Sequence, residues 1–154
     1  MKLLPINRIG PFFGLLLLLL LTYFRENILL EINANIASET YSVSYYYWFS
    51  DFFKKVSPEL LVSWKWGVTV VFSLIMSFIT ILSLYSWFNS IQVLKIISFF
   101  YLGIFAFICL SALIGYLGNS FNDIYFILRK TLGVVQSPIP FFSFFALFYS
   151  LFKR

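Results

Sequence analysis

A long stretch without a charged residue most constrains how this chain can fold. Between Lys65 and Lys95 the sequence contains no acidic or basic residue, and most of its side chains are apolar. Trp66 and Trp87 stand near the two ends of this stretch, about 32 Å apart if it forms one α-helix. That length matches the roughly 30 Å hydrocarbon core of a bilayer, and Trp favours both membrane–water interfaces. The stretch therefore predicts a membrane-spanning helix.

The composition extends this prediction to the whole chain. Of the 154 residues, 61% are apolar, 23% are aromatic and only 11% are charged, against about 25% charged residues in an average soluble domain. A soluble fold of this size needs more charged surface, and its core is too small for 21 Phe side chains. We therefore expect an all-α integral membrane protein that forms a single membrane domain over residues 1–154.

Four transmembrane helices are expected, at about residues 9–30, 62–88, 94–117 and 131–152. The first contains seven consecutive leucines and is interpreted as an uncleaved span, because its apolar region is long and no Ala-x-Ala site follows it. Arg25, near its far end, is expected to extend its side chain to the interface. Ser57, Pro58 and Glu59 form a typical helix start ahead of the second span. A short turn should join the second and third spans into an antiparallel hairpin.

Two short interfacial helices complete the expected architecture. Residues 45–55 place aromatic side chains on one helical face, namely Tyr45, Trp48, Phe49, Phe52 and Phe53. We interpret this segment as a helix lying in the interface, with a docking surface for protein, lipid or glycan as the alternative. Residues 121–130 form the second interfacial segment, and Pro138 is expected to kink the span that follows it.

The residue types argue against catalysis. The chain has no His, which excludes the usual general base and His-based metal sites. Cys109 is the only cysteine and lies in an apolar run, so it is expected to be inert. No two acids share a helical face within a span, which argues against a catalytic pair of carboxylates. The central parts of the spans contain no Asp, Glu, Lys or Arg, which disfavours ion-coupled transport. We expect no enzyme, no catalytic residue, no cofactor and no metal.

Small residues recur at helical spacing on the second and third spans. Such faces let two helices approach closely, so they are expected either to join these spans to each other or to bind another membrane protein. The adjacent basic pair near residue 130 is either an interfacial anchor or a contact for a partner. The partner-binding candidates are therefore Thr69, Ser73, Ser77, Gly103, Ser111, Gly115, Arg129 and Lys130.

The distribution of charge predicts the orientation in the membrane. Four spans place both termini on one side, and the segments expected on that side carry only basic residues, whereas all six acids fall on the other. Lys and Arg alone divide almost evenly between the sides. We expect both termini in the cytoplasm, with the chain in the bacterial inner membrane. The basic residues are scattered rather than arranged in a stripe, so lipid and not nucleic acid is the expected partner.

The order of features resembles the exosortase-associated small membrane proteins of Bacteroidetes, and the exosortase F-associated type in particular. The resemblance is carried by a leucine-rich span ending in Arg25 and Glu26, and by the segments KIISFFYL (95–102), YFILRKTL (125–132), Gln136 and FFSFFALFY (141–149). Members typically carry an aromatic, double-basic stretch, then Gln-Pro, then an aromatic tail ending in Tyr. In this chain Ser137 separates Gln136 from Pro138.

The resemblance implies a helper of an exosortase, a multi-span transpeptidase-like protease that acts on sorting signals of exported proteins. The family has no assigned catalytic residues. The expected function is therefore a non-catalytic accessory or scaffold subunit of a membrane complex. The alternative is a self-associating homo-oligomer that acts as a pore or permeability factor, which small-residue helix faces would serve equally well.

Overall fold

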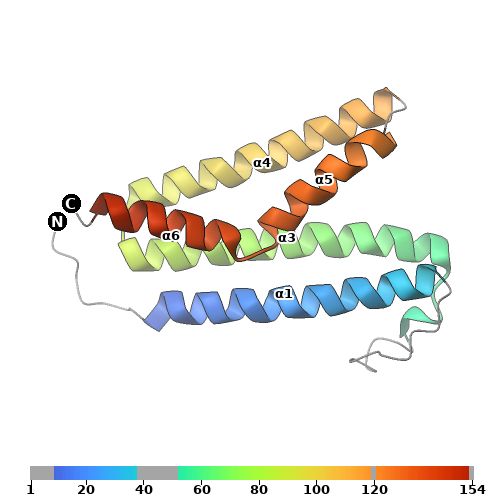
Figure 1. The fold of residues 1–154 in the computed structure, drawn as a ribbon, viewed down its shortest axis with the longest axis horizontal. Helices are drawn as coiled ribbons and strands as arrows, with labels where there is room; N and C mark the ends of the chain where they lie inside the picture. Colours follow the sequence, from blue (N-terminus) through green and yellow to red (C-terminus); the bar gives the residue numbers. More distant parts are fainter. Residues whose placement is uncertain (1–8, 38–51, 119–120, 153–154) are drawn as a thin grey trace.

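The computed structural model describes residues 9–37, 52–118 and 121–152, and the regular structure in these ranges is helical. Its helices are α1 (Ile9–Ile36), α3 (Pro58–Phe88), α4 (Ile91–Leu117), α5 (Phe121–Val135) and α6 (Ile139–Phe152) (Figure 1). α1, α3 and α4 are long and apolar enough to cross a membrane, and α5 with α6 makes a fourth crossing if the bent pair is one span. The prediction of an all-α membrane protein, whose apolar helices contact lipid, is confirmed.

α1 and α3 form an antiparallel pair along their whole length. Near the start of α1, Gly10 and Gly14 lie against α3: a Cβ atom built on Gly10 would stand 3.0 Å from Ser86 Oγ, and one on Gly14 would stand 2.8 Å from Ser83 Cβ. Such contacts need residues without a side chain on one helix. At the other end of the pair, Lys65 Nζ of α3 donates a hydrogen bond to Asn33 Oδ1 of α1 at 2.7 Å. The contacts at both ends are consistent with one antiparallel register.

α3 begins and ends where the sequence predicts. Pro58 is its first residue, after Ser57 in an extended conformation. At the other end Asn89 adopts a left-handed conformation with φ 43° and ψ 45°, and its N–H donates to the Tyr85 carbonyl. Asn tolerates this conformation better than most residues. α4 starts only two residues later, so the expected hairpin of two spans is present, and α4 then diverges from α3 (Figure 1).

The last part of the chain departs from the expected boundaries. The prediction separated an interfacial helix (121–130) from a span (131–152), but α5 continues to Val135 and the break falls at residues 136–138. The segments Ile127–Val135 and Ile139–Phe152 meet at a bend of 59°. Proline has no N–H and disfavours helical geometry in the residue before it. Pro138 therefore determines where α5 ends.

The broken pair runs from one end of the bundle to the other. α5 begins beside the end of α4 and returns along it, and α6 continues to the opposite end (Figure 1). There the Phe152 ring stacks on Phe88 with centroids 5.6 Å apart. Phe12 of α1 contacts Trp87 at the same end, with centroids 6.4 Å apart. The start of α1 and the end of α6 thus lie at the same end of the molecule, as an even number of crossings requires.

Two hydrophobic cores hold the helices together. The larger core fills the half of the bundle that contains α6, and its buried side chains are Leu18, Met76, Leu84, Phe88, Val93, Ile97, Tyr101, Val135, Phe141 and Phe148. The smaller core lies at the other end and consists of Ile32, Phe53 and Leu61. Between the two cores lies a set of polar side chains.

Candidate functional site

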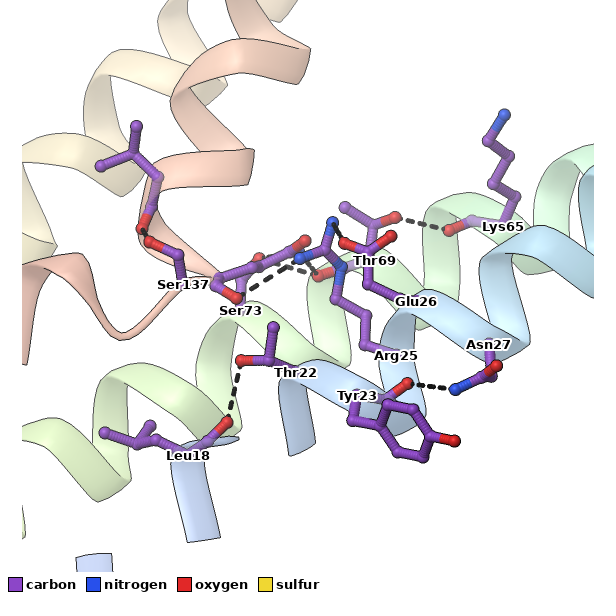
Figure 2. Close-up of polar contacts among 12 residues, drawn as sticks. Leu18, Thr22, Tyr23, Arg25, Glu26, Asn27, Lys65, Thr69, Ser73 and Ser137 are labelled. Carbon is purple, nitrogen blue, oxygen red and sulfur yellow. Dashed lines mark hydrogen bonds and ion pairs between the residues drawn. The ribbon is translucent and has the colours of Figure 1, made fainter. Parts of the chain in front are cut away.

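The polar site lies where α1, α3 and the α5–α6 connection meet. Gln136, 1% exposed, follows the last residue of α5. Its Nε2 donates to the Thr69 carbonyl and to Ser73 Oγ, both at 2.5 Å. Arg25 reaches the same place from α1, beside Thr69 and Ser73 (Figure 2), and its Nη1 donates to the Gln136 carbonyl at 3.3 Å. Three chain segments are thus joined by polar contacts inside an otherwise apolar bundle.

The prolines explain why Arg25 is needed there. In a continuous helix the N–H of residue 140 would donate to the carbonyl of Gln136, but Pro140 has no N–H. The Gln136 carbonyl would then be left unsatisfied in the membrane interior, which is expensive. Arg25 supplies the missing donor. Its positive charge also lies at the C-terminal end of α5, where the helix dipole favours a cation.

The second proline is compensated locally. Pro138 deprives the Val134 carbonyl of its usual donor in the same way. The backbone N–H of Ser137 donates to this carbonyl at 3.2 Å, and Ser137 Oγ donates to it at 2.7 Å. Ser137 Oγ also accepts from the N–H of Ile139 at 3.3 Å, at the start of α6. The break is therefore a satisfied turn rather than an open end.

The position of Arg25 corrects the expectation that it extends to the interface. Its side chain is only 13% exposed, and it turns into the bundle because the break in the last span offers an acceptor there. Its Nη2 pairs with Glu26 Oε1 at 3.1 Å, and the Glu26 side chain is 54% exposed. Arg25 Nε is buried without a hydrogen-bond partner in the described part of the chain. The ion pair thus has an inner positive end and an outer negative end.

The depth of this pair follows from the register of α1 and α3. Lys65 Nζ donates to Asn33 Oδ1 at 2.7 Å. Asn33 of α1 therefore lies at about the same depth in the membrane as Trp66, the residue that follows Lys65 in α3. Arg25 is eight residues closer to the start of α1 than Asn33, which is about 12 Å along a helix. In a hydrocarbon core of roughly 30 Å, that distance is well inside the membrane. The expectation that the central parts of the spans contain no ionisable side chain is therefore wrong for α1.

The small-residue stripe of α3 faces the interior of the bundle. Ser73 and Ser77 are buried and Thr69 is half-buried. Each hydroxyl donates to a carbonyl four residues earlier in α3: Thr69 to Lys65 and Ser73 to Thr69, at 2.8 and 2.7 Å, and Ser77 to Ser73 at 2.7 Å. Ser73 in addition accepts from Gln136. This part of the stripe therefore contacts the α5–α6 connection. The contact expected from the sequence was with either the third span or another membrane protein.

The remaining partner-binding candidates do not form one surface. On α4, Gly103 is exposed, Ser111 is half-buried and Gly115 is buried. Arg129 and Lys130 are both exposed on α5. They belong to the segment Ile127–Val135, which with α6 makes a fourth crossing if the bent pair is one span.

The aromatic segment is only partly described. Tyr45, Trp48 and Phe49 lie outside the described residues. Phe53 is buried in the smaller core, whereas Phe52 is half-exposed and packs edge-on against Trp64 with centroids 5.6 Å apart. Phe53 thus faces the protein's own helices.

Two features of the structure have a signal in the sequence. Gly10 and Gly14 have the spacing of a close helix contact. A proline four residues after Gln136 indicates a carbonyl without its helical donor. The donor itself, 111 residues away in sequence, carried no such signal.

No cluster of potential metal ligands is present in the described ranges: no three Cys, Asp or Glu side chains gather there closely enough to hold an ion. No family model, curated protein or solved structure matches this chain. The basis for a functional inference is therefore the arrangement of its own polar and charged side chains.

Proposed function

We propose that this chain is a non-catalytic accessory subunit of a membrane protein complex, which binds a larger membrane protein through contacts made within the bilayer. The observation that carries the proposal is the exposure of Arg129 on α5, in a segment that we take, together with α6, as the fourth crossing. Charged side chains in membrane-spanning segments are rare and expensive, and they usually meet another helix or a polar pathway. A partner that covers Arg129 removes this cost.

The internal polar groups support a scaffold role. Gln136 donates from its side chain to Ser73 and accepts at its carbonyl from Arg25, and these bonds hold the break in the last span in one geometry. Their hydrogen bonds link parts of the chain that are far apart in sequence, so they stabilise the shape of the bundle. A bundle that is cross-linked in its interior and exposes Arg129 and Lys130 on α5 suits a subunit that presents a surface.

The sequence resemblance supports an exosortase-type sorting transpeptidase as the partner. The corresponding location is the bacterial inner membrane, with both termini in the cytoplasm. The short basic segments at the end of the bundle that contains the start of α1 and the end of α6 favour this orientation.

The substitution Arg129→Gln tests the contact. One polar helix–helix contact in a membrane contributes about 0.6–2 kcal/mol, which corresponds to roughly 3- to 30-fold in affinity. We expect recovery of the partner with the tagged protein, purified from its native host in mild detergent and measured by mass spectrometry, to fall by this factor. The amount of inserted protein should not change.

Lys95→Gln is the matched control, because Lys95 is also exposed and its loss changes the net charge by the same amount. Lys95 lies near the start of α4, away from Arg129 on α5. We expect it to leave recovery of the partner unchanged. Equal recovery with both variants would show that Arg129 does not bind a partner. Purification without any stoichiometric partner would count against the subunit proposal itself.

A self-associating pore remains the second candidate, favoured by one observation. Gly103 lies on the exposed side of α4, and a Cβ atom built there would meet nothing within 4 Å, so a second copy has room to approach closely. Purified protein in dye-loaded liposomes separates the two candidates. Leakage without a partner would support the pore, whereas intact liposomes would support the subunit.

A further inference from the structure

Glu26 is a half-exposed carboxylate on a helix that crosses the membrane. It lies seven residues before Asn33, which is about 10 Å further into the membrane than the level of Trp66. On the exposed flank of α1, Leu19 and Leu30, seven residues before and four residues after it, are 48% and 64% exposed, and Tyr23, three residues before it, is 52% exposed. In a lipid environment the outer side of the carboxylate therefore faces mostly apolar groups.

The ion pair with Arg25 neutralises only the inner side of this group. Arg25 is held by the Gln136 carbonyl and is largely buried, whereas most of the exposed surface of the pair belongs to Glu26. The ion pair therefore presents its negative end, the Glu26 carboxylate, to the surroundings of α1 at this depth. Lys65, another basic side chain on the adjoining helix, donates to Asn33 instead.

From this arrangement we infer that the flank of α1 formed by Leu19, Glu26 and Leu30 is the docking surface for a transmembrane helix of the partner, and that this helix carries a Lys or Arg at the depth of Glu26. The inference rests on the proposed function, since it specifies where the partner binds and by what chemistry. A basic side chain is the group that satisfies a carboxylate in low dielectric, through a charge-assisted hydrogen bond.

Other occupants fit this surface less well. A second copy of the chain, packed through the same flank about a two-fold axis, would bring two Glu26 carboxylates together, and like charges repel at such a contact. Residues 38–51, which follow α1, contain no Lys or Arg. Lipid headgroups lie at the interface, about 10 Å from this depth.

Photo-crosslinking in native membranes tests the inference. The photoreactive residue benzoylphenylalanine replaces Leu19 or Leu30 in the full chain, one position at a time, and a third variant carries it at Phe107 on the exposed side of α4. We expect the first two variants to crosslink to the same protein, through a transmembrane peptide that contains Lys or Arg. The variant at Phe107 should form lipid adducts only.

Glu26→Gln, combined with the Leu30 probe, should reduce the yield of this adduct by roughly threefold or more, as the loss of one polar helix–helix contact does. Glu26→Asp should retain most of the yield. Glu26→Lys should abolish the adduct, and replacing the partner's basic residue with Glu should restore it. The probes at Leu19 and Leu30 leave Glu26 unchanged, so they test the surface even where a variant at Glu26 does not fold.

The outcomes separate this inference from the proposed function. A protein adduct from Phe107 alone would leave the subunit proposal standing and show that α1 is not the docking surface. An adduct with a second copy of the chain, or with a segment without a basic residue, would overturn the inferred partner chemistry. Lipid adducts at all three positions, together with a purification that yields no partner, would overturn both proposals.

Discussion

At the scale of single residues, a missing backbone donor explains an arginine inside the membrane. Pro140 leaves the carbonyl of Gln136 without its helical partner, and Arg25 donates to it from α1. The spacing of the proline and the glutamine was readable from the sequence. The choice of Arg25 as donor was not, because it depends on the register of α1 against α3 and on the position of the break beside them.

Gly14 is the residue whose substitution we expect to be most disruptive in α1. In Gly14→Ala the new methyl group would overlap Ser83, since even the Ser83 Cβ lies only 2.8 Å from it. Overpacking of this kind costs about 1–3 kcal/mol. Unfolding followed in detergent with increasing SDS should show this loss of stability.

Gly67→Ala is the matched control for this substitution, because a Cβ atom at Gly67 meets nothing within 4 Å. We expect Ser83→Gly to restore most of the stability of Gly14→Ala by removing the overlapping atoms. If Gly14→Ala and Gly67→Ala unfold alike, the close approach of α1 and α3 is wrong.

At the scale of elements, the α5–α6 pair shows how far proline patterns predict structure. A kink near Pro138 was expected, and the bend of 59° lies there. The expected boundary at residue 130 differs from the observed end of α5, which is Val135. α5 instead continues past Arg129 and Lys130, since nothing in its backbone prevents a helix before Ser137.

Removing both prolines should straighten this pair. The double substitution Pro138→Ala with Pro140→Ala restores two helical donors, so residues 127 and 151 should move apart by about 4 Å, from a rise of 1.5 Å per residue. Spin labels at these positions, in a chain with Cys109→Ser, allow the distance to be measured by electron paramagnetic resonance. The control is Pro11→Ala in the first turn of α1, which should not change it. An unchanged distance in the double variant would show that Arg25 and Gln136 alone maintain the bend.

At the scale of the whole molecule, the two halves of the bundle differ in polarity. The half that contains α6 is filled by the larger apolar core, whereas the other half contains Arg25, Glu26, Lys65 and the basic pair of α5. The start of α1 and the end of α6 both lie in the apolar half (Figure 1). The membrane domain is therefore asymmetric along its long axis: most of the charged side chains in the described part of the chain lie in one half, and Lys95 of α4 lies in the other.

Reporter fusions test the orientation of this asymmetric bundle. We expect a fluorescent protein to be active at both the N-terminus and the C-terminus, because the segments at that end are short and purely basic. Alkaline phosphatase fused after Gly118, at the far end of α4, should be active, because this enzyme is active in the periplasm and we expect that end to face the periplasm. Active phosphatase at either terminus would contradict the predicted orientation.

The sequence by itself determined that this protein folds in a lipid environment, and it determined much of the local structure. Apolar runs of membrane length predict helices in lipid, and Ser57 with Pro58 marks the start of α3, because both signals act over a few neighbouring residues. Only the tertiary structure decided where the polar groups lie. Arg25 contacts a carbonyl 111 residues away, and Ser73 meets Gln136 rather than only a neighbouring span. Such contacts depend on how helices are placed against one another, and no local pattern encodes that placement.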